Sequence, residues 1–399
     1  MLRTTCRGCE SDQLDQFLDL GLMPLAGGFL PNTEAIAGEK PFPLSAHVCR
    51  TCGLVQILEV VDPEILFQDY SFASSTVSPL VQHFENYATW LRDRLDPRFV
   101  VEFGCNDGIL LAPLERLGIQ ACGVDISQNI TEMARAKGLD VVTGYFDEQT
   151  AETIERRLGR ADVVTGSNAF AHNDRPELIL KAALRILKPH GHLCLEVMYA
   201  GDLLEMYQWD TLYHEHLTFY CLNTLQVLLN RYGFHIVDAE RIPMHGGSLR
   251  VVASLDPEEK PKPSVTDVLE YEKSKALADP ATWMAFGQYI RRKIEVVRQT
   301  LGRLSQNSRI WGYGAAGKAT LWVNACQMNY LEAMVDSSPL RAGKLMPGTH
   351  TPIVFPQELR ANPPDYIFIT AWNYADLIRS KESWFKGIWV TPLPELRFF

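Results

Sequence analysis

Short apolar runs alternate with segments of helical periodicity through the middle of the chain. The runs are FVVEFGCNDG, QACGVDIS, GLDVVTGYF, ADVVTGSNAFAH and LKPHGHLCLEV. The preceding segment, FQDYSFASSTVSPLVQHFENYATWL, repeats apolar residues at helical spacing. Because buried parallel strands are read as short apolar runs between helices, the pattern predicts an α/β fold with helices on both faces of a parallel sheet. Ligands of such a sheet bind at the carboxyl ends of its strands.

The same alternation resumes after SLDPEEKPKPSV, a charged, proline-rich stretch at residues 254–265 that is typical of a linker. A helical pattern follows from about Val265 to Leu304, and then come RIWGYGAAGKATLWVNA, EAMVD and DYIFITAWN. Because 399 residues exceed the usual size of one domain, we predict three domains. Their expected ranges are residues 1–66, 67–255 and 256–399.

Composition and charge narrow the class of protein. Hydrophobic residues make up 46% of the chain and charged residues 22%, as in ordinary globular proteins. The formal net charge of −10, without any lysine- and arginine-rich run, argues against nucleic acid or a membrane surface as partner. The chain also lacks a long apolar run, and its start, MLRTTCRGCE, lacks the apolar core of a signal peptide. We therefore expect a cytoplasmic protein.

Four of the nine cysteines form two C-x-x-C pairs, in TTCRGCES and HVCRTCGL. Two such turns can enclose Zn²⁺ in a tetrahedral shell of four thiolates, which is closed and therefore structural. The predicted ligands are Cys6, Cys9, Cys49 and Cys52. The flanking strand-like runs resemble a zinc ribbon, although the 39 residues between the pairs require one extended loop. A thioredoxin-like redox pair is the alternative, and the five single cysteines are expected in the core.

The turn VEFGCNDGILL joins a predicted strand to a helix. Gly104 and Gly108 permit close backbone approach there, whereas the acidic residues between them suit a cofactor that carries a cation, such as S-adenosyl-L-methionine. Asp125 ends the next strand, where a carboxylate can accept hydrogen bonds from ribose hydroxyls. Together these features predict a class I methyltransferase domain; glycines of an ordinary turn are the alternative. The candidate cofactor-binding residues are Glu102, Gly104, Asn106, Asp107, Gly108, Asp125, Ile126 and Asn168.

The order of the two C-x-x-C pairs, GCNDG, YHEH, HGGSLR and GYGAAGKA resembles the sugar C-methyltransferase family over essentially the whole chain. The resemblance implies an N-terminal zinc-binding domain, a central adenosylmethionine-binding domain and a C-terminal Rossmann-like domain. It also implies a nucleotide-linked keto-deoxysugar as acceptor, methylated most familiarly at C-3 beside a C-4 ketone. Members of the family install branching methyl groups on deoxysugars for antibiotics. We expect the enzyme to act as a monomer.

Carried over by position, Tyr213, Glu215 and His216 match the Tyr-x-Glu-His catalytic motif of the family, and His172 matches a second active-site histidine. The resemblance makes His216 the leading general base. Carbon is a poor nucleophile, so methylation beside a ketone requires a base at the α-carbon and hydrogen-bond donors at the carbonyl oxygen. All three motif residues can act together only in a loop or a bent strand end, because successive strand residues face opposite sides. A divalent-metal site and a structural hydrogen-bonded cluster are the alternatives.

A second glycine-rich turn, WGYGAAGKA, has the G-x-G-x-x-G spacing at Gly312, Gly314 and Gly317, and Asp336 follows after another strand. Read locally, this is a dinucleotide motif and predicts an NAD-dependent oxidoreductase. A helix start with glycine amides binds any phosphate, however, including the diphosphate of a nucleotide sugar. The family resemblance favours that second interpretation, with Lys318 supplying positive charge. A purely structural turn is the third.

Further residues are placed in the acceptor site. The family has a functional tyrosine in the segment before the cofactor domain, and in DYSFASS the matching position is either Tyr70 or Phe72. Candidate acceptor-binding residues are Tyr70, Phe72, His245, Arg250, Tyr313, Gly314, Lys318, Trp372 and Asn373. The competing functions are methylation of a non-sugar small molecule, NAD-dependent oxidation, and a zinc-ribbon interaction module with inactive enzyme domains.

Overall fold

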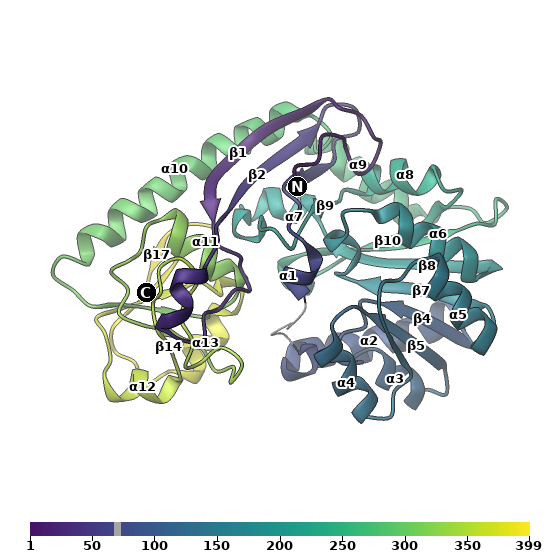
Figure 1. Cartoon of the computed structure of the whole chain (residues 1–399). Coiled ribbons are helices and arrows are strands. Elements are labelled where there is room, and N and C mark those ends of the chain that lie inside the picture. Colours follow the sequence, from purple (N-terminus) through teal and green to yellow (C-terminus); the bar gives the residue numbers. More distant parts are fainter. Residues whose placement is uncertain (68–72) are drawn as a thin grey trace.

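The computed structural model of the chain describes residues 1–67 and 73–399, and Tyr70 and Phe72 therefore lie outside the described residues. Within the described part, the strands form three sheets, one in each of three units that follow one another along the sequence (Figure 1). The α/β fold class predicted from the alternation of runs is confirmed. None of the described helices has the length and apolarity that a membrane crossing needs.

The N-terminal unit is a small antiparallel sheet in the order β1-β2-β3-β9. Its strands are β1 (Leu14–Met23), β2 (Phe42–Cys49), β3 (Val55–Ile57) and β9 (Thr218–Phe219). The segment between β1 and β2 is the extended loop that the cysteine spacing required. It reaches the C-terminal unit, where Leu30 and Leu345 form a β-bridge and His350 contacts Glu39 at 2.8 Å. β9 comes from far along the chain and ties the second unit to this sheet.

The central unit contains a seven-stranded sheet in the order β10-β11-β8-β7-β4-β5-β6. Adjacent strands from β8 to β6 are parallel, whereas β11 runs antiparallel to β8, and β10 to β11. This is the strand order of class I methyltransferases. The strands are β4 (Phe99–Phe103), β5 (Gln120–Asp125), β6 (Val141–Thr143), β7 (Ala161–Ser167), β8 (Leu187–Met198), β10 (His235–Ile242) and β11 (Ser248–Ser254).

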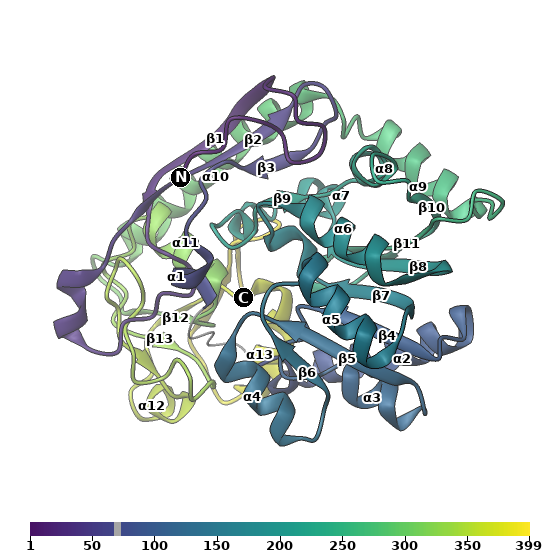
Figure 2. The same cartoon turned by 45° about the vertical axis from the view of Figure 1, so that its right-hand side comes forward.

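Helices flank this sheet, as Figure 2 shows. They are α2 (Ser78–Leu95), α3 (Leu111–Arg116), α4 (Gln128–Ala136), α5 (Glu148–Leu158), α6 (Pro176–Ile186), α7 (Ala200–Glu205) and α8 (Leu222–Asn230), after the short α1 (Pro63–Phe67) of the preceding segment. Amphipathic spacing explains the buried face of α2, where Leu80, Phe84, Tyr87 and Leu91 are all covered. The strand β4 is buried along its whole length, as expected for a central parallel strand.

The C-terminal unit has a second, mostly parallel sheet in the order β14-β13-β12-β15-β16-β17. Its strands are β12 (Ile310–Tyr313), β13 (Met334–Val335), β14 (Ile353–Val354), β15 (Tyr366–Ile369), β16 (Ile388–Thr391) and the antiparallel β17 (Arg397–Phe398). Helices α11 (Gly317–Ala325), α12 (Pro356–Ala361) and α13 (Ala375–Lys381) connect them. The doubly wound pattern predicted for this segment is therefore present.

One continuous helical pattern was predicted from Val265 to Leu304, and the structure corrects it to two helices, α9 (Pro263–Ser274) and α10 (Pro280–Leu304). Ala276 has a positive φ of 50°, which ends the first helix. The carboxylate of Asp279 accepts a hydrogen bond from the Ala281 amide at 2.9 Å, and Pro280 occupies the first position of α10. An N-cap and a proline together begin a new helix, which periodicity alone does not reveal.

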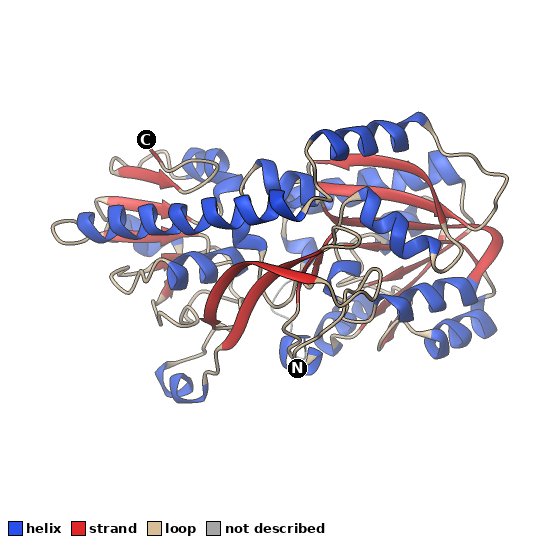
Figure 3. Ribbon diagram, turned by 90° about the horizontal axis from the view of Figure 1, so that it is seen from above, coloured by secondary structure: helices blue, strands red, loops and turns tan. Residues whose placement is uncertain are grey.

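Helix α10 and the strand pair β1–β2 run side by side from one larger unit to the other (Figures 1 and 3). Their contact is close at Gly287 of α10, where a Cβ would lie 1.9 Å from the carbonyl oxygen of Phe17. Phe17 also packs against Trp283 and Phe286 at ring-centroid distances of 5.7 and 6.2 Å. A single buried hydrophobic cluster extends through all three units. This continuity fixes the N-terminal unit as a brace between the other two.

Candidate active site and zinc centre

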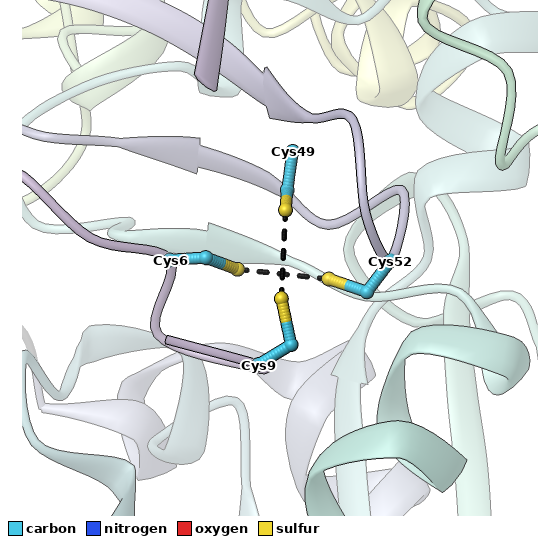
Figure 4. A group of neighbouring side chains, drawn as sticks. All are labelled: Cys6, Cys9, Cys49 and Cys52. Atoms are coloured by element: carbon cyan, nitrogen blue, oxygen red, sulfur yellow. Dashed lines mark hydrogen bonds between the residues drawn. The ribbon is translucent and has the colours of Figure 1, made fainter. Parts of the chain in front are cut away.

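The four cysteines of the two C-x-x-C pairs converge on one point (Figure 4). The Sγ atoms of Cys6 and Cys52 are 3.6 Å apart, as are those of Cys9 and Cys49, and all four lie within 4.8 Å of one another. Zn–S bonds of about 2.3 Å in a tetrahedron place sulfur atoms about 3.8 Å apart. The group therefore fits a four-coordinate zinc ion. All five remaining cysteines are buried, as predicted.

The first glycine-rich turn follows β4 at the carboxyl edge of the central sheet. Gly104 has a φ of 65°, and a Cβ there would lie 2.3 Å from the Cβ of Ala169. Asp125, at the end of the neighbouring strand β5, accepts hydrogen bonds from the amides of Asn106 and Ser127, each at 3.0 Å. Half-buried Ile126 follows it. The turn and this carboxylate thus form one unit, in which only glycine fits beside Ala169 at position 104.

Three buried polar atoms lie at the same edge and have no hydrogen-bond partner within the described part of the chain. They are Glu102 Oε2 of β4, Ser167 Oγ of β7 and Asn168 Oδ1 just after β7. Burial raises the pKa of Glu102 well above its usual value, and the nearby Asp125 adds to the shift. Unpartnered buried polar groups are costly unless a ligand completes them. These acceptors fit the amino group and the sulfonium charge of S-adenosylmethionine.

The side chains of Asn106 and Asp107 hold the segment that follows the undescribed residues. The amide of Ser74 donates to Asn106 Oδ1 at 2.9 Å, and Ser75 donates to Asp107 through its amide and its hydroxyl. Lys137 forms an ion pair with Asp107 at 3.0 Å. Both residues were predicted to bind the cofactor, and the structure engages their side chains with protein. Gly108 has a φ of 80° and packs tightly against Leu139.

The Tyr-x-Glu-His motif lies in an irregular segment between the 3-10 helix η4 (Trp209–Thr211) and β9. Joint action of the three residues requires a loop or a bent strand end, and this irregular segment meets that requirement. His216 Nδ1 lies 2.8 Å from the carbonyl oxygen of Thr211 and donates to it, which leaves Nε2 as the basic nitrogen. The ring of Tyr213 is 4.0 Å from that of His216, and the ring of His172 is 5.0 Å away.

The electrostatics of this group favour neutral histidines. Burial lowers the pKa of His216 well below its usual value, and the neighbouring His172 lowers it further. Burial, then His245, lowers the pKa of His172 to about 4. Glu215 lies against Gly27 of the N-terminal unit, and burial raises its pKa to about 7. At neutral pH the histidines can therefore accept protons, while Glu215 is poised between its two forms.

Asp210, just before the motif, is fully buried and contacts the C-terminal unit. Its Oδ2 accepts hydrogen bonds from the indole nitrogens of Trp322 at 2.9 Å and Trp372 at 2.7 Å. The ammonium of Lys318 lies 4.6 Å from the ring centroid of Trp372. No local pattern in the sequence points to Asp210, because its partners are far away in the chain. Trp372, predicted to bind the acceptor, is thus engaged in the interior.

Other predicted acceptor residues are distributed differently. The hydroxyl of Tyr313 donates to Glu382 at 3.2 Å inside the core of the C-terminal unit. Nε and Nη2 of Arg250 both donate to Oε1 of Glu196, at 2.8 and 2.6 Å, so its guanidinium is occupied. Exposed His245, with a φ of 53°, has its pKa lowered to about 4 by surrounding protein and then by Lys318. It shares this electrostatic neighbourhood with His216, whereas Tyr313 and Arg250 are held by other partners.

The second glycine-rich turn faces the motif. A Cβ at Gly317, the first residue of α11, would lie 3.1 Å from Cζ of Tyr213. Gly314 has a φ of 99°, and half-buried Asn373 lies near it in the 3-10 helix η6 (Trp372–Tyr374). Asp336, the acidic residue of a dinucleotide motif, forms an ion pair with Arg341 at 3.0 Å, and Arg341 also donates to the carbonyl of Ala315. The carboxylate that would hold a ribose is therefore occupied, which disfavours NAD.

Three family models match the chain: "Putative zinc binding domain" at residues 6–67, "Methyltransferase domain" at 81–239 and "C-methyltransferase C-terminal domain" at 243–394. The chain is 32% identical over 402 residues to C-methyltransferase NovU of Streptomyces niveus, a match that covers 98% of this chain and 96% of the relative. The chain belongs to this C-methyltransferase family. The C-methyltransferase uses S-adenosyl-L-methionine and carries a four-cysteine zinc-binding domain, as the sequence predicted.

Other likenesses cover less of the C-methyltransferase. A ubiquinone biosynthesis O-methyltransferase of Xanthomonas oryzae pv. oryzae is 31% identical over 101 residues, which are 25% of this chain and 42% of the relative. The crystal structure of magnesium protoporphyrin IX methyltransferase (ChlM) from Synechocystis PCC 6803 with bound SAH is 18% identical. That match covers 44% of this chain and 83% of the other, with a TM-score of 0.35.

We predict that Cys49→Ser abolishes zinc binding by the purified enzyme. A shell of three thiolates no longer satisfies the tetrahedral preference of the ion, so the metal content should fall from about one zinc per chain to near zero. Elemental analysis by mass spectrometry measures this, and thermal unfolding should begin several degrees lower. Cys122→Ser changes a buried cysteine outside the group and should keep its zinc. Full zinc content in Cys49→Ser would contradict the assignment.

We predict that Asp125→Asn weakens S-adenosylhomocysteine binding, measured by calorimetry. Each hydrogen bond to a charged group contributes about 1.5–3 kcal/mol, so loss of the carboxylate should raise Kd roughly 10–100-fold. The matched control is Asp336→Asn, the corresponding acidic residue of the second glycine-rich unit, which should leave this affinity unchanged. Equal weakening in both variants, or in neither, would place the cofactor elsewhere.

Proposed function

We propose that this C-methyltransferase methylates the carbon beside the ketone of a nucleotide-linked 4-keto-deoxysugar of the thymidine diphosphate type, through an enolate. The observation that carries the proposal is the single tautomer of His216. Its Nδ1 is engaged by the Thr211 carbonyl, so Nε2 is the basic nitrogen, within a group of aromatic and histidine rings. This arrangement supports a neutral general base, which the removal of an α-proton requires.

The chain's own residues can be assigned to the steps of this proposal. His216 Nε2 takes the proton from the α-carbon, and the electron pair moves onto the ketone oxygen. Tyr213 and His172, whose rings flank or approach His216, donate hydrogen bonds to that oxygen. Glu215 orients a substrate hydroxyl from the side of Gly27. S-adenosylmethionine supplies the methyl group as an electrophile, and the protein contributes positioning and exclusion of water.

The nucleotide part of the acceptor is proposed to bind at the start of α11. The first amides of any helix lack intrahelical partners and attract phosphate. Gly317, at this start, is in contact range of Tyr213, so a diphosphate bound there would present its sugar to the motif. We also propose that the enzyme acts as a monomer. The reduced thiolates of a zinc site are compatible with a cytoplasmic enzyme.

We predict that His216→Ala lowers turnover with the keto-deoxysugar nucleotide about 10³-fold, the usual effect of losing a general base. Affinity for S-adenosylhomocysteine should change less than about two-fold, because the cofactor turn is separate from the motif. The matched variant His214→Gln changes the neighbouring histidine, whose Nε2 faces the carbonyl of Pro43 at 2.9 Å, and should keep most of the activity. Wild-type turnover in His216→Ala would refute the mechanism.

The acceptor class is tested at Ala316, the N-cap residue of α11. Ala316→Asp provides a favourable helix cap but places negative charge where the diphosphate is proposed to bind. We predict that it weakens thymidine diphosphate binding more than about ten-fold, as expected for a repelled dianion. Ala316→Ser caps the helix without charge and should bind as the wild type does. Absence of binding in the wild type would instead favour a non-sugar acceptor, which needs no such site.

A further inference from the structure

Lys318 occupies an unfavourable position for protein stability. It is the second residue of α11, where the positive end of the helix repels a cation. Its Nζ is buried and has no hydrogen-bond partner among the described residues. An isolated ammonium away from water is strongly disfavoured unless it is compensated. Lys318 was predicted to supply positive charge to the diphosphate, yet its ammonium is enclosed against the face of Trp372.

The compensation for this charge comes from Asp210. Burial lowers the pKa of Lys318 and raises that of Asp210, and the attraction between the two groups opposes both shifts. They do not form a direct ion pair within 4 Å. The two indole N–H groups hold Oδ2 of Asp210, while its Oδ1 has no hydrogen-bond partner in the described part of the chain. The positive charge is therefore only partly neutralised.

Lys318 also lies close to the Tyr-x-Glu-His motif. A Cβ at Gly317, the residue before Lys318, would lie 3.1 Å from Cζ of Tyr213, whose ring is 4.0 Å from that of His216. Burial and His172 lower the pKa of His216 most, and Lys318 acts in the same direction with a smaller effect. Thr211, whose carbonyl fixes the His216 ring, directly follows Asp210 in the chain. One short segment thus holds the counter-charge of Lys318 and orients the base. The titratable groups that face His216 are His172, His245 and Lys318, with Tyr213 and Glu215 beside it in the motif.

We propose that Lys318 is a positioning residue for methyl transfer: its enclosed ammonium, held near Asp210 and against Trp372 at the start of α11, stabilises the enolate by its field. This role rests on the proposed function. When His216 Nε2 removes the α-proton, the acceptor gains a negative charge and the histidine a positive one. A fixed cation nearby favours the anion through space. Transfer of the methyl group then removes the anionic charge, and the proton on His216 leaves to solvent.

Two measurements on the full-length enzyme test this role with Lys318→Met, which retains the length of the side chain without its charge. The first follows exchange of the acceptor's α-proton for deuterium by NMR, with S-adenosylhomocysteine bound so that no methyl is transferred. The second titrates His216 by NMR of labelled histidine, with its signal assigned from His216→Gln. The control is Lys293→Met, which removes a buried lysine packed on Tyr207 and Tyr289 of a different region.

In Lys318→Met we expect α-proton exchange at least about 100-fold slower, within the range of electrostatic stabilisers. The midpoint of His216 titration should rise, as expected on removal of a nearby like charge. A merely structural role would not produce this directional shift. Wild-type exchange and an unchanged titration in Lys318→Met would overturn the proposal, as would the same changes in Lys293→Met.

The two measurements separate this inference from the proposed function. If the wild-type enzyme exchanges no proton of the nucleotide sugar, the acceptor assignment fails. The titration needs no acceptor, so it still shows whether the charge of Lys318 acts on His216. If the wild type exchanges and the variant exchanges equally fast, the role of Lys318 fails while the proposed function stands.

Discussion

The arrangement of the active site depends on the hydrogen bonds that the carboxylate of Asp210 accepts. Asp210 belongs to the segment before the catalytic motif, and it accepts hydrogen bonds from two indoles of the C-terminal unit. Replacement of either partner would leave a buried charge less well satisfied, at a cost of several kcal/mol. Because β9 follows within a few residues and pairs with β3, the same short segment is also fixed to the N-terminal sheet. The motif is therefore held from two sides.

The N-terminal unit completes this framework and does so at a distance from the chemistry. Its strand β1 packs closely against α10 at Gly287, because any side chain at this position would meet the carbonyl of Phe17. The cysteine group fixes the far end of the same sheet, and Gly27 lies against Glu215. A zinc site in so small a sheet supplies folding energy that its limited core does not. Loss of the metal should therefore disturb Glu215 through the backbone, although no cysteine approaches the motif.

The features that could be predicted from the sequence are those encoded by neighbouring residues. The short apolar runs predicted the central sheet, and the two C-x-x-C pairs predicted the thiolate group. Gly104 and Gly108 predicted a tight turn after the first strand of that sheet. Contacts between distant segments left no such local signal. Periodicity did not show the break before α10, and the ion pair of Asp336 with Arg341 was hidden behind an apparent dinucleotide motif. The placement of Lys318 against Trp372 likewise depends on packing between distant segments.

The two glycine-rich turns have the same backbone design and opposite electrostatics. The first carries the carboxyl groups of Glu102 and Asp125, which suit the cation of adenosylmethionine. The second begins a helix whose amides and Lys318 provide positive charge. In the proposed reaction, a sulfonium and an enolate combine to give neutral products, so charge disappears in the transition state. Water would stabilise the separated charges more than that transition state, and a partly desolvated motif between the two turns removes this disadvantage. The low pKa values of His172 and His216 are the cost of such a site, and they keep the base unprotonated at neutral pH.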